Sequence, residues 1–189
     1  MVFTEQDVKQ LLQEALQQAQ SEPDTGETTK KINFNRSQYW VKALAEQFKK
    51  RYEGDTDIRI FTKSDYSNRR DFGLNELLYD ILVCRVGEVE SSLHKKRLCF
   101  INEVLWQVES EFAHNTRSVL IDFNKLVLGS GRNKLFIASH VKRGTENSFL
   151  SVLKPAAGYC MGDVYVAMIP HPSKWVDAVN DVHLWVFKK

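Results

Sequence analysis

Apolar residues recur every three or four positions in the first part of the chain, a spacing typical of amphipathic helices. The pattern predicts one helix over residues 4–20 and a second over residues 37–51. Thr4, with Asp7 three residues later, has the arrangement of a helix N-cap. The polar segment 21–31 contains proline and glycine, so it is the best candidate for a linker between the two helices.

The rest of the chain alternates short apolar runs with amphipathic helices. Runs rich in β-branched and aromatic residues predict strands, at residues 57–63, 75–86, 98–112, 134–139, 164–169 and 182–187. One helix is predicted over residues 116–128 and another over residues 146–154, where we expect Pro155 to end it. This order of elements predicts an α/β fold with a mixed central β-sheet flanked by helices.

Two of the predicted strands contain carboxylates among apolar residues. Glu109 and Glu111 lie two positions apart, so they share one face of the sheet with Gln107. Asp80 is flanked by large apolar residues in an upstream strand. Carboxylates in such surroundings carry a desolvation cost, which a hard divalent cation would relieve. Asp80, Glu109 and Glu111 therefore form a candidate metal site; the alternative places them at strand ends, paired with Arg or Lys.

The helix predicted over residues 116–128 follows the acidic strand and returns along the sheet. Lys125 on its polar side could then lie near the carboxylates and stabilise developing negative charge. The alternative is a surface ion pair with Asp122, three residues earlier. His140 follows a short buried strand, a position that often carries site residues in α/β sheets, although a lone histidine is more often structural.

Composition and motifs say more about the cellular compartment of the protein than about its function. The formal net charge of +2 neither supports nor excludes a nucleic-acid partner. The three cysteines show neither CxxC nor zinc-ligand spacing, which favours free thiols in a reducing compartment. The start of the chain lacks a signal-peptide pattern, and no apolar run is as long as a membrane span. We therefore expect a cytoplasmic protein with no membrane partner.

The αβββαβ order, the aspartate in the second core strand and the acidic pair in the third resemble the PD-(D/E)XK nuclease superfamily, which has a restriction-endonuclease-like fold. The resemblance covers about residues 36–140. Asp80 matches the aspartate of the motif, Glu109 matches its acidic residue, and Glu111 falls where the motif has lysine. The pair could also be read as Gln107 and Glu109. The chain departs from the motif because it lacks the strand lysine and the proline before the aspartate.

The resemblance implies a nuclease that uses Mg²⁺ or Mn²⁺ to hydrolyse phosphodiester bonds of nucleic acid. DNA is the expected partner, and a homodimer is left open. Asp80, Glu109 and Glu111 would bind the metal. Glu111 could also orient the attacking water. Lys125 would take the part of the missing strand lysine, as in members whose lysine has moved to the following helix.

The resemblance also implies a domain organisation and an assisting acid. Residues 1–22 would form an N-terminal helix, and residues 32–189 would form the nuclease-like α/β domain. An acid upstream of the motif often assists in this family, and both Glu53 and Glu76 fit that position. The missing strand lysine favours an alternative function: a non-catalytic module of the same fold that binds nucleic acid or protein.

Overall fold

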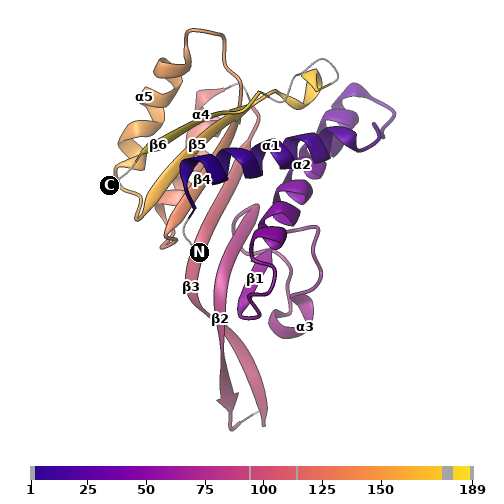
Figure 1. The fold of residues 1–189 in the computed structure, drawn as a ribbon, viewed down its shortest axis with the longest axis vertical. Helices are drawn as coiled ribbons and strands as arrows, with labels where there is room; N and C mark the ends of the chain where they lie inside the picture. Colours follow the sequence, from indigo (N-terminus) through magenta and orange to yellow (C-terminus); the bar gives the residue numbers. More distant parts are fainter. Residues whose placement is uncertain (1–2, 94, 114, 176–180, 188–189) are drawn as a thin grey trace.

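The computed structural model of the 189-residue chain describes residues 3–93, 95–113, 115–175 and 181–187. Two N-terminal helices precede a mixed six-stranded sheet with interspersed helices, so the predicted α/β class is confirmed (Figure 1). The helices are α1 (Glu5–Ser21), α2 (Thr29–Arg51), α3 (Arg69–Phe72), α4 (Thr116–Val127), α5 (Glu146–Ala157) and the 3-10 turn η1 (Pro172–Lys174). The strands are β1 (Ile58–Phe61), β2 (Ile81–Ser91), β3 (Lys96–Glu111), β4 (Asn133–Ser139), β5 (Asp163–Ile169) and β6 (His183–Phe187). Within the described ranges, no helix has the length and apolar content that crossing a membrane requires.

The two N-terminal helices begin at capping residues. The hydroxyl of Thr4 accepts a hydrogen bond from the backbone N–H of Asp7, whose carboxylate accepts one from the N–H of Thr4, which completes a capping box. Helix α2 begins at Thr29, well before its predicted start. Its first turns are polar, so the apolar pattern did not reveal them. The Thr28 hydroxyl caps them by accepting a hydrogen bond from Lys31 N.

The six strands lie in the sheet in the order in which they occur in the sequence. β1, β2 and β3 are antiparallel neighbours, β3, β4 and β5 are parallel, and β6 returns antiparallel to β5. The carboxyl ends of β3, β4 and β5 therefore lie at the same edge of the sheet as the starts of β2 and β6. We call this the upper edge, because it is towards the top of Figure 1.

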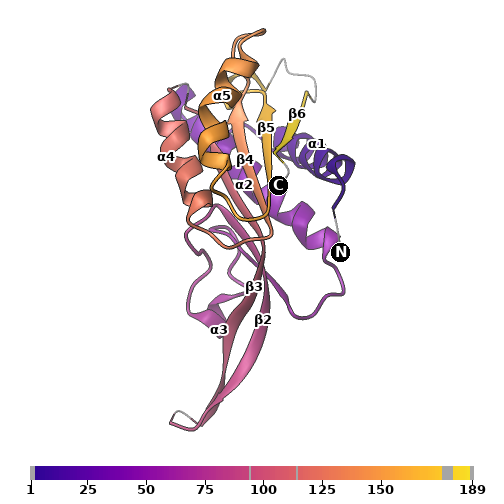
Figure 2. The same cartoon turned by 90° about the vertical axis from the view of Figure 1, so that its left-hand side faces the viewer.

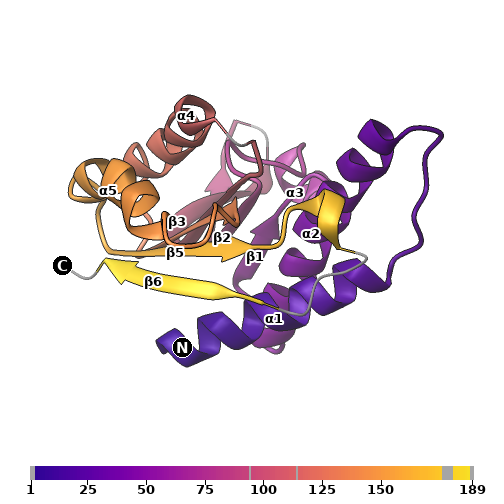
Figure 3. The same ribbon diagram turned by 90° about the horizontal axis from the view of Figure 1, so that it is seen from above.

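Helices cover both faces of the sheet (Figures 2 and 3). Side chains alternate between the faces along each strand, so the sheet separates two apolar cores. In β4, Leu135 and Ile137 belong to the core with α1 and α2. Phe136 and Ala138 belong to the core with α4 and α5. The site described below lies on the α4 face.

The strand predicted over residues 75–86 begins later than expected. β2 starts at Ile81, and the residues before it form turns. Leu78 has a φ of 58° and is 68% exposed, so this apolar residue does not belong to a buried strand. Asp80 therefore lies immediately before β2, which puts it at the upper edge of the sheet.

The outer halves of β2 and β3 form a two-stranded arm that projects from the body of the molecule (Figures 1 and 2). β1 pairs only with residues 82–85 of β2. Residues 86–91 and 96–101 pair with each other, and no third strand joins them in the described part of the chain. We call these two segments the hairpin arm.

Helix α5 continues past Pro155 to Ala157, so the predicted end of this helix was wrong. A proline lacks one backbone donor and obstructs the carbonyl of the preceding turn. Near the end of a helix few hydrogen bonds remain to be lost, and Gly158 N still donates to the carbonyl of Lys154. The helix therefore accommodates the proline in its last turn.

Candidate functional site

The three predicted acidic residues come together at the upper edge. Asp80 precedes β2, and Glu109 and Glu111 lie at the end of β3. Ile81 pairs with Val108, so Asp80 comes beside the end of β3. The backbone N–H of Ser110 donates a hydrogen bond of 2.9 Å to Oδ2 of Asp80 and fixes the orientation of this carboxylate.

Helix α4 brings Lys125 to the same place. In the parallel register, Glu109 lies opposite Phe136 and Glu111 lies opposite Ala138, on the face that α4 covers. Nζ of Lys125 lies 3.1 Å from Oε2 of Glu109 and 2.8 Å from Oδ1 of Asp122. The lysine therefore bridges the strand carboxylate and its neighbour on the helix. We call Asp80, Glu109, Glu111, Asp122 and Lys125 the acidic cluster.

Burial and like charge disfavour ionisation of the two central carboxylates. Burial, reinforced by the negative charge of Asp80, raises the pKa of Glu109 to about 8, and Lys125 offsets only part of this effect. Burial also raises the pKa of Asp80 to about 6, although the Ser110 N–H and Lys125 act in the opposite direction. Glu109 is 2% exposed, and its Oε1 has no hydrogen-bond partner among the residues that the structure describes. The cluster thus contains a buried oxygen with unused acceptor capacity.

A second carboxyl pair joins β3 to α4. Burial, together with a hydrogen bond to Asp122, raises the pKa of Glu111. Burial opposes ionisation of Asp122, but hydrogen bonds from Glu111 and Lys125 hold the pKa of Asp122 below its ordinary value. Burial likewise works against the charge of Lys125, yet Asp122 and Glu109 raise the pKa of its ammonium group. Asp122 and Glu109 therefore favour the charged form of Lys125, whereas burial and the hydrogen bond to Asp122 favour the neutral form of Glu111.

Comparisons of this chain with protein-family models, curated proteins and solved structures found no match.

Gln107 lies on the same face but contacts backbone. Its Oε1 accepts a hydrogen bond of 2.8 Å from the N–H of Gly131. A Cβ atom at Gly129 would lie 1.7 Å from Nε2 of Gln107, so only glycine permits this close approach. The two glycines let the loop after α4 close over the buried amide, a role additional to ending the helix. If Gln107 and Glu109 were the metal-binding pair, Gln107 would have to give up its hydrogen bond with Gly131 in order to bind the metal.

Of the two candidate upstream acids, Glu76 is electrostatically linked to the cluster. The negative charge of Glu76 is among the influences that raise the pKa of Asp80. Glu53 follows α2 and is exposed. The electrostatic effect on Asp80 therefore favours Glu76 as the acid that accompanies the cluster.

Two aromatic residues that the sequence analysis did not single out support the cluster. The hydroxyl of Tyr79 donates to the backbone carbonyl of Lys125 at 3.3 Å. Burial, followed by the charge of Glu109, raises the pKa of this phenol. On the opposite face, Nε1 of Trp40 donates to Oγ of Ser110, whose backbone holds Asp80. The only sequence signal for Tyr79 was its position next to Asp80.

His140 belongs to a different group of residues. It follows β4 at the upper edge, where it lines a pocket with Asp181 and His183. Asp181 and His183 were not predicted from the sequence together with His140. His140 is also separate from the acidic cluster, because its pocket lies at β4, β5 and β6, whereas the cluster lies at β2, β3 and α4.

Proposed function

We propose that the chain is a metal-dependent nuclease that hydrolyses phosphodiester bonds of nucleic acid. The observation that carries this proposal is the environment of Glu109. This carboxyl group is buried, lies beside Asp80 and Lys125, and has an oxygen to which no side chain or backbone group in the described part of the chain is hydrogen-bonded. A divalent cation would use that oxygen and would favour the ionised form of both carboxylates.

The donor set fits Mg²⁺ or Mn²⁺. Asp80, Glu109 and Glu111 offer only oxygen ligands, which hard divalent cations prefer. Bound there, the metal would polarise a phosphoryl oxygen and lower the pKa of a coordinated water. The burial that raises the pKa of Glu109 and Asp80 is the same feature that metal binding would counteract.

The protein groups would position and neutralise the reacting phosphate. Lys125 is held by Asp122 and Glu109, so its ammonium group has a fixed place next to the proposed metal ligands. A preorganised positive charge at that place would stabilise the charge that develops on the phosphate. Glu111, whose pKa is raised by burial and by the hydrogen bond to Asp122, could orient a water in its ionised form. Lys125 would take the part of the lysine that the motif has where this chain has Glu111.

The order of the elements supports the resemblance to restriction-endonuclease-like proteins. Apart from the one-turn helix α3 between β1 and β2, the elements α2, β1, β2, β3, α4 and β4 follow one another as αβββαβ. The three antiparallel strands lead into a helical crossover that makes β4 parallel to β3. Asp80 lies immediately before β2 and Glu109 lies near the end of the adjacent β3, close to the positions that the motif of that superfamily gives to its two acidic residues.

A cleavage assay tests the proposal. Single- and double-stranded DNA and RNA are incubated with the protein and Mg²⁺ or Mn²⁺, and EDTA should abolish any cleavage. Asp80→Ala and Glu109→Ala should each abolish metal-dependent cleavage while the far-UV circular dichroism spectrum is retained. Glu88→Ala is the matched control, because Glu88 is an exposed carboxylate on the hairpin arm. Full activity in either cluster variant would show that the site is assigned wrongly.

The second candidate function is a non-catalytic module that binds nucleic acid or protein. It is favoured by the contacts of Lys125, whose ammonium group is engaged by the carboxylates of Glu109 and Asp122. A ligand that binds only the folded state raises the melting temperature. A melting temperature that does not change at millimolar Mg²⁺ or Mn²⁺ would favour the binding module over the nuclease.

A further inference from the structure

Three metal-binding side chains meet at the upper edge, in a place that the proposed nuclease function does not use. His140 follows β4, and His183 is the first residue of β6, with Asp181 two residues before it. β5 lies between these strands, and its Met168 pairs with both Ala138 and His183. The sheet register therefore brings the two histidines together, although they are far apart in the sequence.

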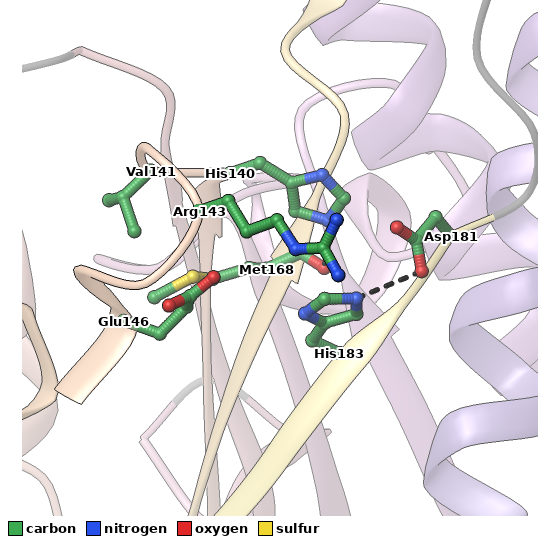
Figure 4. A pocket seen from close by; sticks show the side chains of 7 residues that line it. All are labelled: His140, Val141, Arg143, Glu146, Met168, Asp181 and His183. Atoms are coloured by element: carbon green, nitrogen blue, oxygen red, sulfur yellow. Dashed lines mark hydrogen bonds and ion pairs between the residues drawn. The ribbon is translucent and has the colours of Figure 1, made fainter.

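The geometry of this histidine pocket is close to that of a metal site. One ligand atom from each of His140, Asp181 and His183 lies within 4.8 Å of the other two. Nε2 of His183 lies 3.0 Å from Oδ1 of Asp181, and the centroids of the two imidazole rings are 5.0 Å apart. Figure 4 shows the three side chains converging from the end of β4 and the start of β6.

The surroundings leave room for a metal ion and for a further ligand. The side chains line a cavity of about 370 Å³, to which Arg143 and Glu146 also contribute. The carbonyl of Met168 lies 3.2 Å from Nε2 of His140 and helps to hold this half-buried ring in place. Histidine ligands in metal sites commonly donate their other ring N–H to a backbone carbonyl, which fixes the orientation of the ring.

The ligand types select the class of metal. Two imidazoles and one carboxylate suit divalent transition metals such as Zn²⁺, whereas Mg²⁺ and Ca²⁺ prefer oxygen alone. Zinc bonds to nitrogen and oxygen are about 2.0–2.2 Å long, so tetrahedral ligands lie roughly 3.3 Å from one another. Reaching that spacing requires the ligand atoms to approach by about 1–2 Å. Asp181 and His183 are about half exposed, so side-chain rotation can supply this movement.

We propose that His140, Asp181 and His183 bind one divalent transition-metal ion of the Zn²⁺ class, with a coordination position left open. Three protein ligands and an open position are typical of sites that bind water or a substrate atom. The guanidinium group of Arg143 in the same pocket favours an anionic group as the additional ligand. This site is separate from the acidic cluster and does not depend on the nuclease proposal.

Metal titration of the full, untagged chain tests the site. Isothermal titration calorimetry with Zn²⁺ should give a stoichiometry of one, and Co²⁺ should give visible absorption bands of a nitrogen- and oxygen-ligated ion. His140→Ala and His183→Ala should each weaken Zn²⁺ binding at least about a hundredfold, because even partners outside the first shell contribute about 10–100-fold. Asp181→Asn should also weaken Zn²⁺ binding. This variant should fold like the wild type, because the side chain of Asp181 is about half exposed.

Matched variants distinguish this site from other Zn²⁺ ligands. His171→Ala removes a histidine that caps η1 and does not line the pocket. Cys99→Ser removes a partly exposed thiol, and Glu88→Gln removes an exposed carboxylate of the hairpin arm. All three should bind Zn²⁺ like the wild type. The proposal is overturned if the double variant His140→Ala/His183→Ala keeps wild-type binding, or if the wild type binds no Zn²⁺ at millimolar concentration.

Discussion

The buried carboxyl group of Glu109 should make the metal-free protein less stable as the pH rises. In the folded state its pKa is about 8, against an ordinary value of 4.5. The folded state therefore binds this proton more tightly than the unfolded state, and the linked free energy of unfolding falls between these two pH values. Below about pH 4.5 the group is protonated in both states and exerts no such effect. Glu109→Gln, which remains neutral, should remove this pH dependence.

The magnitude follows from the pKa difference. At about 1.36 kcal/mol per pKa unit, the change from 4.5 to about 8 corresponds to an upper limit of roughly 5 kcal/mol. The effective dielectric response of real protein sites is larger than that of a dry interior, which reduces the effect. We expect Glu109→Gln to be about 2–3 kcal/mol more stable than the wild type at pH 8.5 and nearly equal to it at pH 4.5.

Urea unfolding in EDTA, followed by circular dichroism at pH 4.5, 6.5 and 8.5, measures this difference. Glu88→Gln is the control, since Glu88 lies in an exposed ion pair with Arg97, and its stability should follow the wild type at each pH. Mg²⁺ should stabilise the wild type at pH 8.5 and have less effect on Glu109→Gln. A stability difference that is the same at all three pH values, or a Gln variant that is less stable at pH 8.5, would refute the reasoning.

Three further predictions concern single contacts. Lys125→Ala should lower metal-dependent cleavage roughly a hundredfold in kcat, and Lys125→Arg should restore it only in part, because a guanidinium fork differs in shape from an ammonium group; lost stability with an unchanged rate would leave Lys125 as an ion-pair residue only. Gly129→Ala should destabilise the protein by about 1–3 kcal/mol in urea unfolding, because its Cβ would meet the amide of Gln107, and Gln107→Ala in the same chain should relieve the clash. Thr4→Ala should cost about 1 kcal/mol through loss of the capping box of α1, and an unchanged urea midpoint would contradict this.

The acidic cluster could be predicted from sequence because its parts follow from short-range rules. Alternation along a strand placed Glu109 and Glu111 on one face, and the return of a helix over the sheet placed Lys125 above them. The prediction for Asp80 was less accurate. Leu77, Leu78 and Tyr79 resemble the start of a buried strand, but the positive φ of Leu78 breaks it. Asp80 still reached the site, because the residue before β2 lies at the same edge as the end of β3.

The histidine pocket could not be predicted from the same rules. Its position depends on β5 lying between β4 and β6, which is a property of the sheet order. The contact of Gln107 with Gly129 and Gly131 was missed for a similar reason. Glycines after a helix usually indicate its end, and the sequence alone does not show which side chain approaches them. Contacts between elements that are distant in the chain therefore account for most of what the sequence analysis left out.

The strand order also has a consequence for how the chain folds. Each strand pairs with the strand that precedes or follows it in the sequence, so the described sheet contains no pairing between strands distant in the chain. Closing a loop costs conformational entropy that grows with its length, and domains rich in contacts between nearby segments fold faster. Every strand pairing here closes over the one segment that connects the two strands: a turn between β2 and β3, a helical crossover between the parallel strands, and a longer connection in the other two pairs. The sheet can therefore grow strand by strand from the β2–β3 hairpin, and we expect this domain to fold rapidly for a six-stranded mixed sheet.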